Sequence, residues 1–269
     1  MGRVTIPRRD KSRRRWIRLN GEMMPVLAYH KVDDKFELGV ANVKPRQFVR
    51  QVSALIHHGI EIADSPDQVA IDQRKIYLTF DDGYDCFYRN VVPYLTSIGT
   101  KAIVFVISDF IGKKNSWDIR LSYAPFIHMN ENQLREISGL GFEIGSHSCS
   151  HRDLSRLDRK SSWNELVNSK KKIEDVIGKG IESLSFPYGR HNHDVVEQSR
   201  DAGYKILFGL GSVVSEGVFG RIPVYRIDGP AAMRRKATMN RLEILKSDFI
   251  HSFANISALI SIRKKPVSE

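Results

Sequence analysis

Short runs of β-forming residues alternate with helical patterns along most of this 269-residue chain. Such alternation is typical of a parallel sheet wrapped by helices, because each crossover between parallel strands needs a helix-length connection. The predicted helices begin near residues 45, 85, 131, 158 and 192, and a glycine of the kind that ends helices follows each one. The predicted strands cover residues 25–30, 75–80, 101–107, 142–144, 183–186, 205–208 and 224–227. About seven β/α units fit, which favours a barrel or a wide open sheet over two domains.

The positive charge of the chain is concentrated near its beginning. The sequence has 42 Lys and Arg against 31 Asp and Glu, a net charge of +11, and residues 1–18 hold eight of the basic side chains and one acid. An arm of this kind can bind nucleic acid or an anionic membrane surface, but it is more often a solvated, disordered tail. We therefore expect a basic arm over residues 1–21 and no nucleic-acid partner.

One α/β domain is expected over residues 22–230, followed by an amphipathic helix in residues 231–269 that packs on it. A stripe of large apolar residues usually closes a core, although a membrane-surface or partner-binding helix shows the same spacing. The stripe residues recur at steps of three and four: Leu242, Leu245, Phe249, Phe253, Ile256 and Ile260.

The sequence gives few signs of a targeting segment or of disulfide bonds. After the arm, no apolar run is long enough for a signal-peptide core or a membrane span. The default expectation is a cytoplasmic protein, with peripheral membrane contact through the basic arm as an alternative. The two cysteines, Cys86 and Cys149, are too few for a disulfide framework and do not form a C-x-x-C pair.

Polar residues follow several predicted strands at their carboxyl ends, where sites form in parallel α/β folds. We expect these side chains to meet at one edge of the sheet. In chain order they are His30 after 25–30, Asp81 and Asp82 after 75–80, His147 and His151 after 142–144, and Pro187 and Tyr188 after 183–186.

Two histidines and a carboxylate in this set suggest a metal site. His147 and His151 share one face if residues 147–151 form a helical turn, which suits two imidazole nitrogens on one divalent ion. Each signal is weak alone, because histidines at this spacing usually have ordinary structural roles and Asp-Asp-Gly is usually a turn. Together they leave a metal position open for water and one carboxylate free to act as a base. Cys149 should point away from the two histidines.

The motifs resemble those of the polysaccharide deacetylases, carbohydrate esterase family 4, which include the nodulation-factor chitooligosaccharide deacetylases. Residues 79–83 (Thr-Phe-Asp-Asp-Gly) and 147–151 (His-Ser-Cys-Ser-His) are similar to the family's first two motifs, and residues 186–189 (Phe-Pro-Tyr-Gly) resemble its third. Residues 25–32 resemble the opening strand of the biofilm poly-N-acetylglucosamine deacetylase branch. The resemblance covers roughly residues 24–228.

This resemblance implies a single-domain, distorted (β/α)7 barrel that binds one divalent metal ion. The implied ligands are Asp82, His147 and His151, and the expected ion is Zn2+, with Co2+, Ni2+ or Fe2+ as alternatives. The implied reaction removes N-acetyl groups from an amino-sugar glycan or a glycan precursor.

The resemblance also implies roles for residues around the metal. Asp81 would be the general base, and Pro187 and Tyr188 would contact substrate, with a backbone N–H near Tyr188 stabilising the oxyanion. Trp117 lies in a long segment after a predicted strand and could stack on a sugar ring, although such an aromatic packs against its own protein about as often.

Two departures from the family pattern affect the catalytic roles. The arginine that usually precedes the third-motif proline by two residues is replaced by Ser185. Arg226, near the end of the last predicted strand, is the first candidate to orient Asp81 in its place, with Arg221 behind it, and an exposed strand-end arginine is an equal alternative.

The second departure is the absence of a C-terminal Leu-x-His motif, which often supplies the general acid in this family. His30 is expected to take that role, since the first and last strands of a closed barrel are neighbours and an imidazole with a pKa near 6.5 can donate a proton. His251 is expected to be a packed or surface histidine.

Three alternative functions remain open from the sequence. The same site could remove a formyl or acetyl group from a small or lipid-linked sugar, or open a cyclic amide, because loops set specificity. The chain could instead be a catalytically impaired carbohydrate-binding relative, or it could bind nucleic acid through its arm.

Overall fold

The computed structural model describes residues 25–37, 39–65, 74–116, 125–211 and 217–261, with side chains up to residue 251. The basic arm predicted for residues 1–21 and Trp117 both lie outside the described residues.

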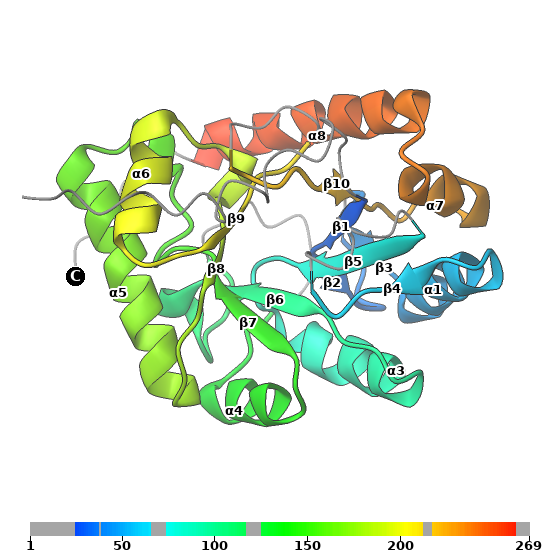
Figure 1. Ribbon diagram of the computed structural model, residues 1–269, viewed down its shortest axis with the longest axis horizontal. Helices are drawn as coiled ribbons and strands as arrows, with labels where there is room; N and C mark the ends of the chain where they lie inside the picture. Colours follow the sequence, from blue (N-terminus) through cyan, green and yellow to red (C-terminus); the bar gives the residue numbers. More distant parts are fainter. Residues whose placement is uncertain (1–24, 38, 66–73, 117–124, 212–216, 262–269) are drawn as a thin grey trace, which may run out of the picture.

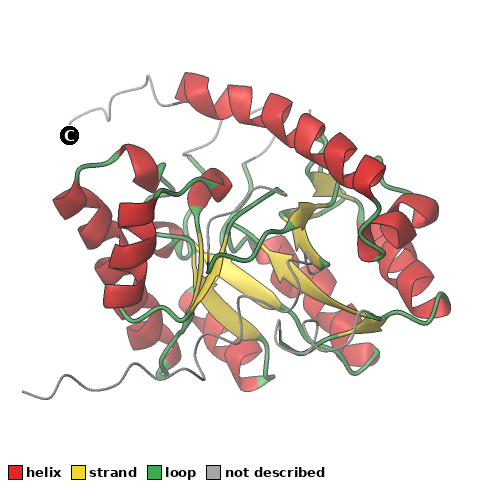
Figure 2. Ribbon diagram, turned by 45° about the horizontal axis from the view of Figure 1, so that its top comes forward, coloured by secondary structure: helices red, strands yellow, loops and turns green. Residues whose placement is uncertain are grey.

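The strands form a curled parallel sheet at the centre of the molecule, with helices around its outside (Figures 1 and 2). Its path runs β10-β1-β5-β6-β7-β8-β9, and β4 also pairs with β5. These strands are β1 (Val26–Tyr29), β4 (Glu61–Ile62), β5 (Lys75–Phe80), β6 (Ile103–Val106), β7 (Glu143–Ser146), β8 (Ser183–Ser185), β9 (Ile206–Phe208) and β10 (Ile222–Pro223). A second, two-stranded sheet contains β2 (Lys31–Val32) and β3 (Asn42–Val43).

The two ends of the sheet path are linked across a short seam. Phe208 at the end of β9 forms an isolated parallel bridge with Phe219. The amide of Gly211 donates a hydrogen bond to the carbonyl of Arg221, at 2.8 Å. The sheet therefore closes into a distorted (β/α) barrel of one domain, which confirms the predicted fold class.

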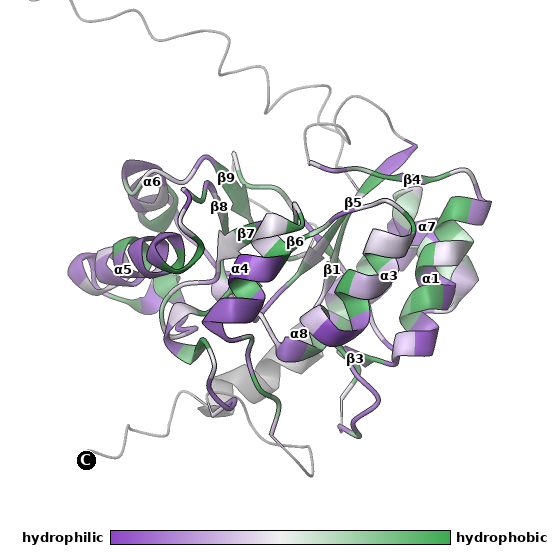
Figure 3. Ribbon diagram, turned by 90° about the horizontal axis from the view of Figure 1, so that it is seen from below, coloured by the Kyte–Doolittle hydropathy of each residue, from purple (hydrophilic) through white to green (hydrophobic). Residues whose placement is uncertain are grey.

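Helices around the sheet carry both hydrophilic and hydrophobic residues, as α1 and α4 show (Figure 3). The sequence spacing predicts one apolar stripe of Phe48, Val52, Leu55 and Ile56 in α1; the first three are buried, whereas Ile56 is 45% exposed. The principal helices are α1 (Pro45–His57), α3 (Val92–Ser97), α4 (Glu131–Gly139), α5 (Arg159–Ile177), α6 (His193–Asp201), α7 (Pro230–Ala237) and α8 (Arg241–Ser261). Three-residue 3-10 turns occur at Ser108–Phe110, Leu154–Arg156 and Pro187–Gly189.

Local chemistry explains the ends of these helices. Asp158 caps α5 by accepting a hydrogen bond from the amide of Ser161, and Gly178 ends it in a left-handed conformation. Asn130 and Gln133 form a reciprocal capping box at the start of α4.

The segment 85–98 differs from the regular helix predicted for it. It contains a π-helical turn at Phe87–Val91 followed by α3. Pro93 has no amide hydrogen for the carbonyl four residues before it, so the regular α-helical ladder is interrupted here.

The last strand also differs from its prediction over 224–227. β10 ends at Pro223, and Tyr225 begins a turn in which its amide donates to the Asp228 carboxylate and its carbonyl accepts from the Asp228 amide. Apolar residues continue beyond the strand because the turn is itself largely buried: Val224 and Tyr225 are in the interior.

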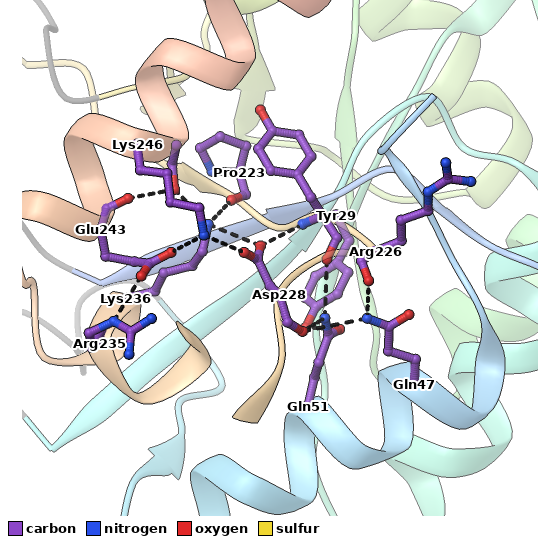
Figure 4. A network of polar contacts seen from close by, with 12 residues as sticks. Tyr29, Gln47, Gln51, Pro223, Arg226, Asp228, Arg235, Lys236, Glu243 and Lys246 are labelled. Atoms are coloured by element: carbon purple, nitrogen blue, oxygen red, sulfur yellow. Dashed lines mark hydrogen bonds and ion pairs between the residues drawn. The ribbon is translucent and has the colours of Figure 1, made fainter. Parts of the chain in front are cut away.

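A buried polar network attaches α7 and α8 to the barrel (Figure 4). The Lys236 ammonium contacts the Asp228 carboxylate at 3.1 Å and donates to the Pro223 carbonyl and the Ser247 hydroxyl, each at 2.6 Å. Burial lowers the pKa of Lys236, and the Asp228 carboxylate opposes that shift. The backbone carbonyl of Asp228 also accepts a hydrogen bond from Gln51 of α1, at 2.8 Å.

The face of α8 that packs on the barrel is not the predicted one. Glu243, Ile244 and Ser247 are buried, whereas Leu242, Leu245 and Phe249 are 79%, 62% and 64% exposed. The core prediction is wrong for these three residues, because Glu243 and Ser247 bind Arg235 and Lys236 of α7 and so turn the polar face inward. The side chains of Phe253, Ile256 and Ile260 lie outside the described ones. In the described part of the chain, no helix has the length and apolarity needed to span a membrane.

Candidate metal and catalytic site

Asp82, His147 and His151 come together at the carboxyl ends of β5 and β7, as the sequence predicts. The Asp82 Oδ1 atom lies 3.6 Å from His147 Nε2 and 3.5 Å from His151 Nε2. All three side chains are buried, and their ligand atoms lie within 4.8 Å of one another. Metal–ligand bonds of about 2.0–2.1 Å in tetrahedral geometry separate ligand atoms by about 3.4 Å. The donor atoms and their spacing therefore fit a metal such as Zn2+.

The histidines are prepared to act as neutral ligands. His147 Nδ1 lies 2.7 Å from the Ser185 carbonyl. Since a carbonyl only accepts, the proton is on Nδ1 and the lone pair on Nε2 faces Asp82. Burial lowers the pKa of His147 and of His151, which keeps both rings neutral.

Residues 147–151 form a loop rather than the helical turn considered from the sequence. Ser148 and His151 have left-handed backbones, with φ of 64° and 60°. Glu165 of α5 accepts hydrogen bonds from the amides of Cys149 and Ser150, each at 2.9 Å, and thereby holds the loop. The Cys149 thiol donates to the Glu165 carbonyl at 3.3 Å, so it points toward α5.

Asp81 forms a two-pronged ion pair with Arg221. The Arg221 guanidinium donates to Asp81 Oδ1 at 2.7 Å and to Oδ2 at 2.9 Å, and both side chains are buried. Burial alone would raise the pKa of Asp81, but the charge and hydrogen bonds of Arg221 hold it well below its usual range. Arg221 also donates to Ser185 Oγ at 2.7 Å. Ser185 stands where the family usually has an arginine, so the Arg221 guanidinium lies directly beside that position.

Arg226, the first candidate for this position, does not reach Asp81. It is exposed, and its guanidinium donates to the Glu37 carbonyl at 3.3 Å. The reason is the early end of β10: Arg221 lies directly before the strand and points into the barrel, whereas Arg226 lies in the turn beyond it. The placement predicted for Arg226 is therefore wrong, and Arg221 is the arginine beside Asp81.

His30 lies on the open side of Asp81. Its Nε2 atom is 3.9 Å from Asp81 Oδ2, and its side chain is 27% exposed. Burial lowers the pKa of His30 to about 4, although the Asp81 charge opposes this shift. His30 is thus close to the carboxylate as predicted, but its lowered pKa makes it uncharged at neutral pH, whereas a pKa near 6.5 would leave it partly protonated.

Tyr188 and Pro187 form a tight turn beside the metal ligands. The Tyr188 ring packs edge-on against the His151 ring at 4.6 Å between centroids, and its backbone φ is 60°. Gly189 continues the turn in a left-handed conformation, where a Cβ would lie 2.5 Å from Leu210 atoms. A side chain at this position would therefore collide with the segment after β9.

His251 reaches this turn from α8. Burial lowers the pKa of His251, while a hydrogen bond with the Tyr188 backbone raises it. It is a packed histidine, as expected, but it packs at the edge of the site.

One buried residue of the site was missed in the sequence. His128 Nδ1 lies 2.8 Å from the Asp82 carbonyl, and its ring stacks on Tyr84 with 4.6 Å between centroids. Asp82 has a left-handed backbone with φ of 70°, so the His128 hydrogen bond fixes a strained peptide that carries a metal ligand. Burial lowers the pKa of His128 to about 4, which keeps it a neutral donor through Nδ1. No motif marks His128, and only its place in the fold identifies it.

Comparison with known proteins agrees with this geometry. The polysaccharide deacetylase family model matches residues 68–207, just over half of the chain. The YxkH protein of Bacillus subtilis (strain 168), whose name places it among the polysaccharide deacetylases, is 24% identical over 212 residues, which is 76% of this chain and 70% of YxkH. The poly-beta-1,6-N-acetyl-D-glucosamine N-deacetylase of Staphylococcus aureus (strain MRSA252) is 24% identical over 147 residues, 51% of this chain. The chain spans about half, 48%, of that relative's length.

Solved structures show the same fold. The Streptococcus pyogenes deacetylase PplD, in complex with acetate, superposes with a TM-score of 0.68 and 19% identity, over 80% of this chain and 97% of PplD. IcaB from Ammonifex degensii gives a TM-score of 0.64 and 20% identity, over 79% of this chain and 94% of IcaB. With the family match and a shared barrel, this chain belongs to the polysaccharide deacetylase family of hydrolases.

Proposed function

We propose that this protein is a metal-dependent N-deacetylase that removes acetyl groups from N-acetylated amino sugars in a glycan or glycan precursor. The observation that carries the proposal is the division of labour between adjacent carboxylates. Asp82 faces two neutral histidines, whereas Asp81 faces a fully buried arginine. This arrangement supports a metal-binding role for Asp82 and a proton-exchanging role for Asp81.

The residues present fit a divalent ion, with Asp82, His147 and His151 as its protein ligands. Such an ion would supply a water of lowered pKa and would polarise the acetamide carbonyl. Zn2+ suits the two nitrogen donors and one oxygen donor, and Co2+, Ni2+ and Fe2+ accept the same set.

Asp81 acts as the proton acceptor. Its low pKa keeps it anionic at neutral pH, and Arg221 holds both carboxylate oxygens in a fixed orientation. A proton taken from the attacking water would reside on Asp81 while the water oxygen bonds to the acetyl carbon.

His30 passes a proton to the departing amine. It is neutral at rest and lies 3.9 Å from Asp81 Oδ2, so it can take up the proton that Asp81 has gained. When the C–N bond breaks, that proton goes to the amine nitrogen, and acetate and the free amino sugar leave. The turn at Pro187–Gly189 lies beside His151 and is the candidate backbone contact for the carbonyl oxygen.

Two observations favour a glycan with N-acetylglucosamine units as substrate. The opening strand resembles that of the biofilm deacetylase branch, and a relative is named for poly-beta-1,6-N-acetyl-D-glucosamine. The impaired-relative alternative loses its main support, because Arg221 fills the place beside Ser185.

The test measures acetate release from poly-N-acetylglucosamine, chitooligosaccharides and peptidoglycan fragments. Purified protein is assayed as isolated, after removal of metal by a chelator, and after addition of Zn2+. We expect acetate from at least one glycan, loss of activity on chelation and recovery with metal. Release that is insensitive to complete metal removal would contradict the metal-dependent mechanism, and a metal-loaded protein inactive on all three glycans would contradict the substrate class.

A further inference from the structure

The outer face of α8 carries large apolar side chains. Leu242, Leu245 and Phe249 follow one another at steps of three and four residues, so they lie along one stripe of the helix. They are 79%, 62% and 64% exposed, which makes them the most exposed large apolar group on any described helix. The exposed Arg241 precedes the stripe, and Lys246 lies beside it, 45% exposed, with its ammonium 3.0 Å from the Glu243 carboxylate.

The inner face of α8 fixes this orientation. Glu243 accepts a hydrogen bond from Arg235 at 2.8 Å, and Ser247 accepts one from the buried Lys236 at 2.6 Å. Turning the apolar stripe inward would break these contacts and leave the Lys236 charge buried without them. The exposure of the stripe is therefore determined by specific polar contacts.

The net positive charge of the chain is concentrated in its two terminal segments, one of which contains α8. Residues 230–269 contain eight Lys and Arg against three Asp and Glu, a net charge of +5. Residues 1–18 have eight against one, a net charge of +7, and residues 19–229 have 26 against 27, a net charge of −1. The barrel is nearly neutral, so the segment that exposes the apolar stripe is also a centre of positive charge.

We propose that the outer face of α8 binds an anionic lipid bilayer, with Leu242, Leu245 and Phe249 inserted at the headgroup boundary. An apolar stripe bordered by cations is the pattern of helices that lie in a membrane interface. A nucleic acid would use the cations but would leave the leucines in water. A second copy of this chain would bring like charges together.

The position of the stripe gives this binding a consequence for the barrel. His251 follows Phe249 by two residues on α8 and bonds to the Tyr188 backbone beside the metal ligands. Two residues correspond to roughly 200° around a helix, so His251 faces the barrel while the stripe faces away from it, and α8 would lie between a bound bilayer and the Tyr188 turn. This inference concerns binding and does not depend on the proposed reaction.

The experiment measures partition of the full-length protein onto sedimented vesicles of phosphatidylcholine alone or with about 30% phosphatidylglycerol. The test variant is Leu245→Ser with Phe249→Ser. The matched control is Ile98→Ser with Leu140→Ser, which removes two large side chains, 38% and 43% exposed, from the far ends of α3 and α4. Circular dichroism and thermal unfolding check that all three proteins are folded, and light scattering measures their mass.

We expect binding to the anionic vesicles, weaker binding to phosphatidylcholine, and at least about a tenfold loss for the α8 variant, because the apolar contacts and the charges both contribute. The control should bind as the parent does. Equal binding by the α8 variant would assign the attraction to the charges alone and overturn the proposal. A parent dimer that becomes a monomer in the α8 variant, with no vesicle binding, would overturn it in favour of self-association.

Discussion

Arg221 and Asp81 are joined by two parallel hydrogen bonds of 2.7 and 2.9 Å, although 140 residues separate them in the sequence. Arg221→Lys keeps a positive charge but cannot make both bonds. We expect turnover to fall on the order of 100-fold with the metal retained, since the carboxylate loses its orientation. The pH at which activity is lost on acidification should also rise, because the pKa of Asp81 is less strongly depressed.

Arg226→Lys is the matched control for that variant. Arg226 is exposed, and its side chain donates to the Glu37 carbonyl far from Asp81, so its replacement should leave turnover and the pH profile nearly unchanged. A large effect at Arg226 with none at Arg221 would reverse the assignment. Steady-state rates of both variants and of the parent, measured from pH 5 to 9, give the turnover and the pH profile.

Variants at the two adjacent aspartates should differ in how much metal they bind. Asp81→Asn should keep about one equivalent of metal and lose most turnover, since it removes a proton acceptor and no ligand. Asp82→Asn, His147→Ala and His151→Ala should each lose the metal. Elemental analysis of the purified proteins measures the difference, and metal loss in Asp81→Asn alone would exchange the two roles.

His30→Ala should lower turnover by about 10²–10⁴ while metal content and fold are kept. Because burial lowers the pKa of His30 to about 4, the shape of the rate profile between pH 6 and 9 should not depend on this residue. His251→Ala should have a smaller effect, confined to substrate binding through the Tyr188 turn. An ionisation near pH 6.5 that disappears in His30→Ala would contradict the lowered pKa.

His128→Leu should weaken metal binding by about 10–100-fold, because it removes the donor that fixes the Asp82 peptide. His128→Asn places an amide nitrogen near the Nδ1 position and should recover much of the affinity. Competition with a zinc indicator measures the constants, with His57→Leu at an exposed position of α1 as control. Equal affinity for the leucine variant and the parent would rule out the positioning role.

The metal-free protein should lose stability as the pH falls from about 7 to 4. Buried His30 and His128 have pKa values of about 4 in the folded protein, against about 6.5 when unfolded, and His147 and His151 are also lowered. The unfolded chain therefore binds more protons in this range, so the free energy of unfolding rises with pH. Urea unfolding in a chelator at pH 7.5, 6 and 5 should show this slope, and a flat or inverted dependence would contradict it.

The parts of the fold set by local pattern could be predicted from the sequence. The stripe of α1, the glycine that ends α5 and the residues after β5 and β7 all occur where periodicity and turn chemistry place them. Asp82, His147 and His151 could be grouped because strand ends converge in parallel sheets.

The features that were mispredicted depend on contacts between distant segments. Nothing near Arg226 in the sequence shows that β10 ends at Pro223, since that end is set by pairing with β1. The hydrogen bond from Lys236 to Ser247 determines which face of α8 packs on the barrel. Hydrophobic periodicity does not predict such a polar contact. His128 is recognisable only once its segment lies against Asp82.

The seam between β9 and β10 has a consequence for the order in which the site can mature. The three residues that fit a metal ion all lie between positions 82 and 151, so a ribosome delivers them well before it delivers Arg221. A nascent or truncated chain that stops before Arg221 would have these ligands but no partner for the buried Asp81 charge. Asp81, the proposed proton acceptor, would therefore reach its working state only when one of the last barrel segments docks, which would make seam closure a late checkpoint for the proposed activity during synthesis.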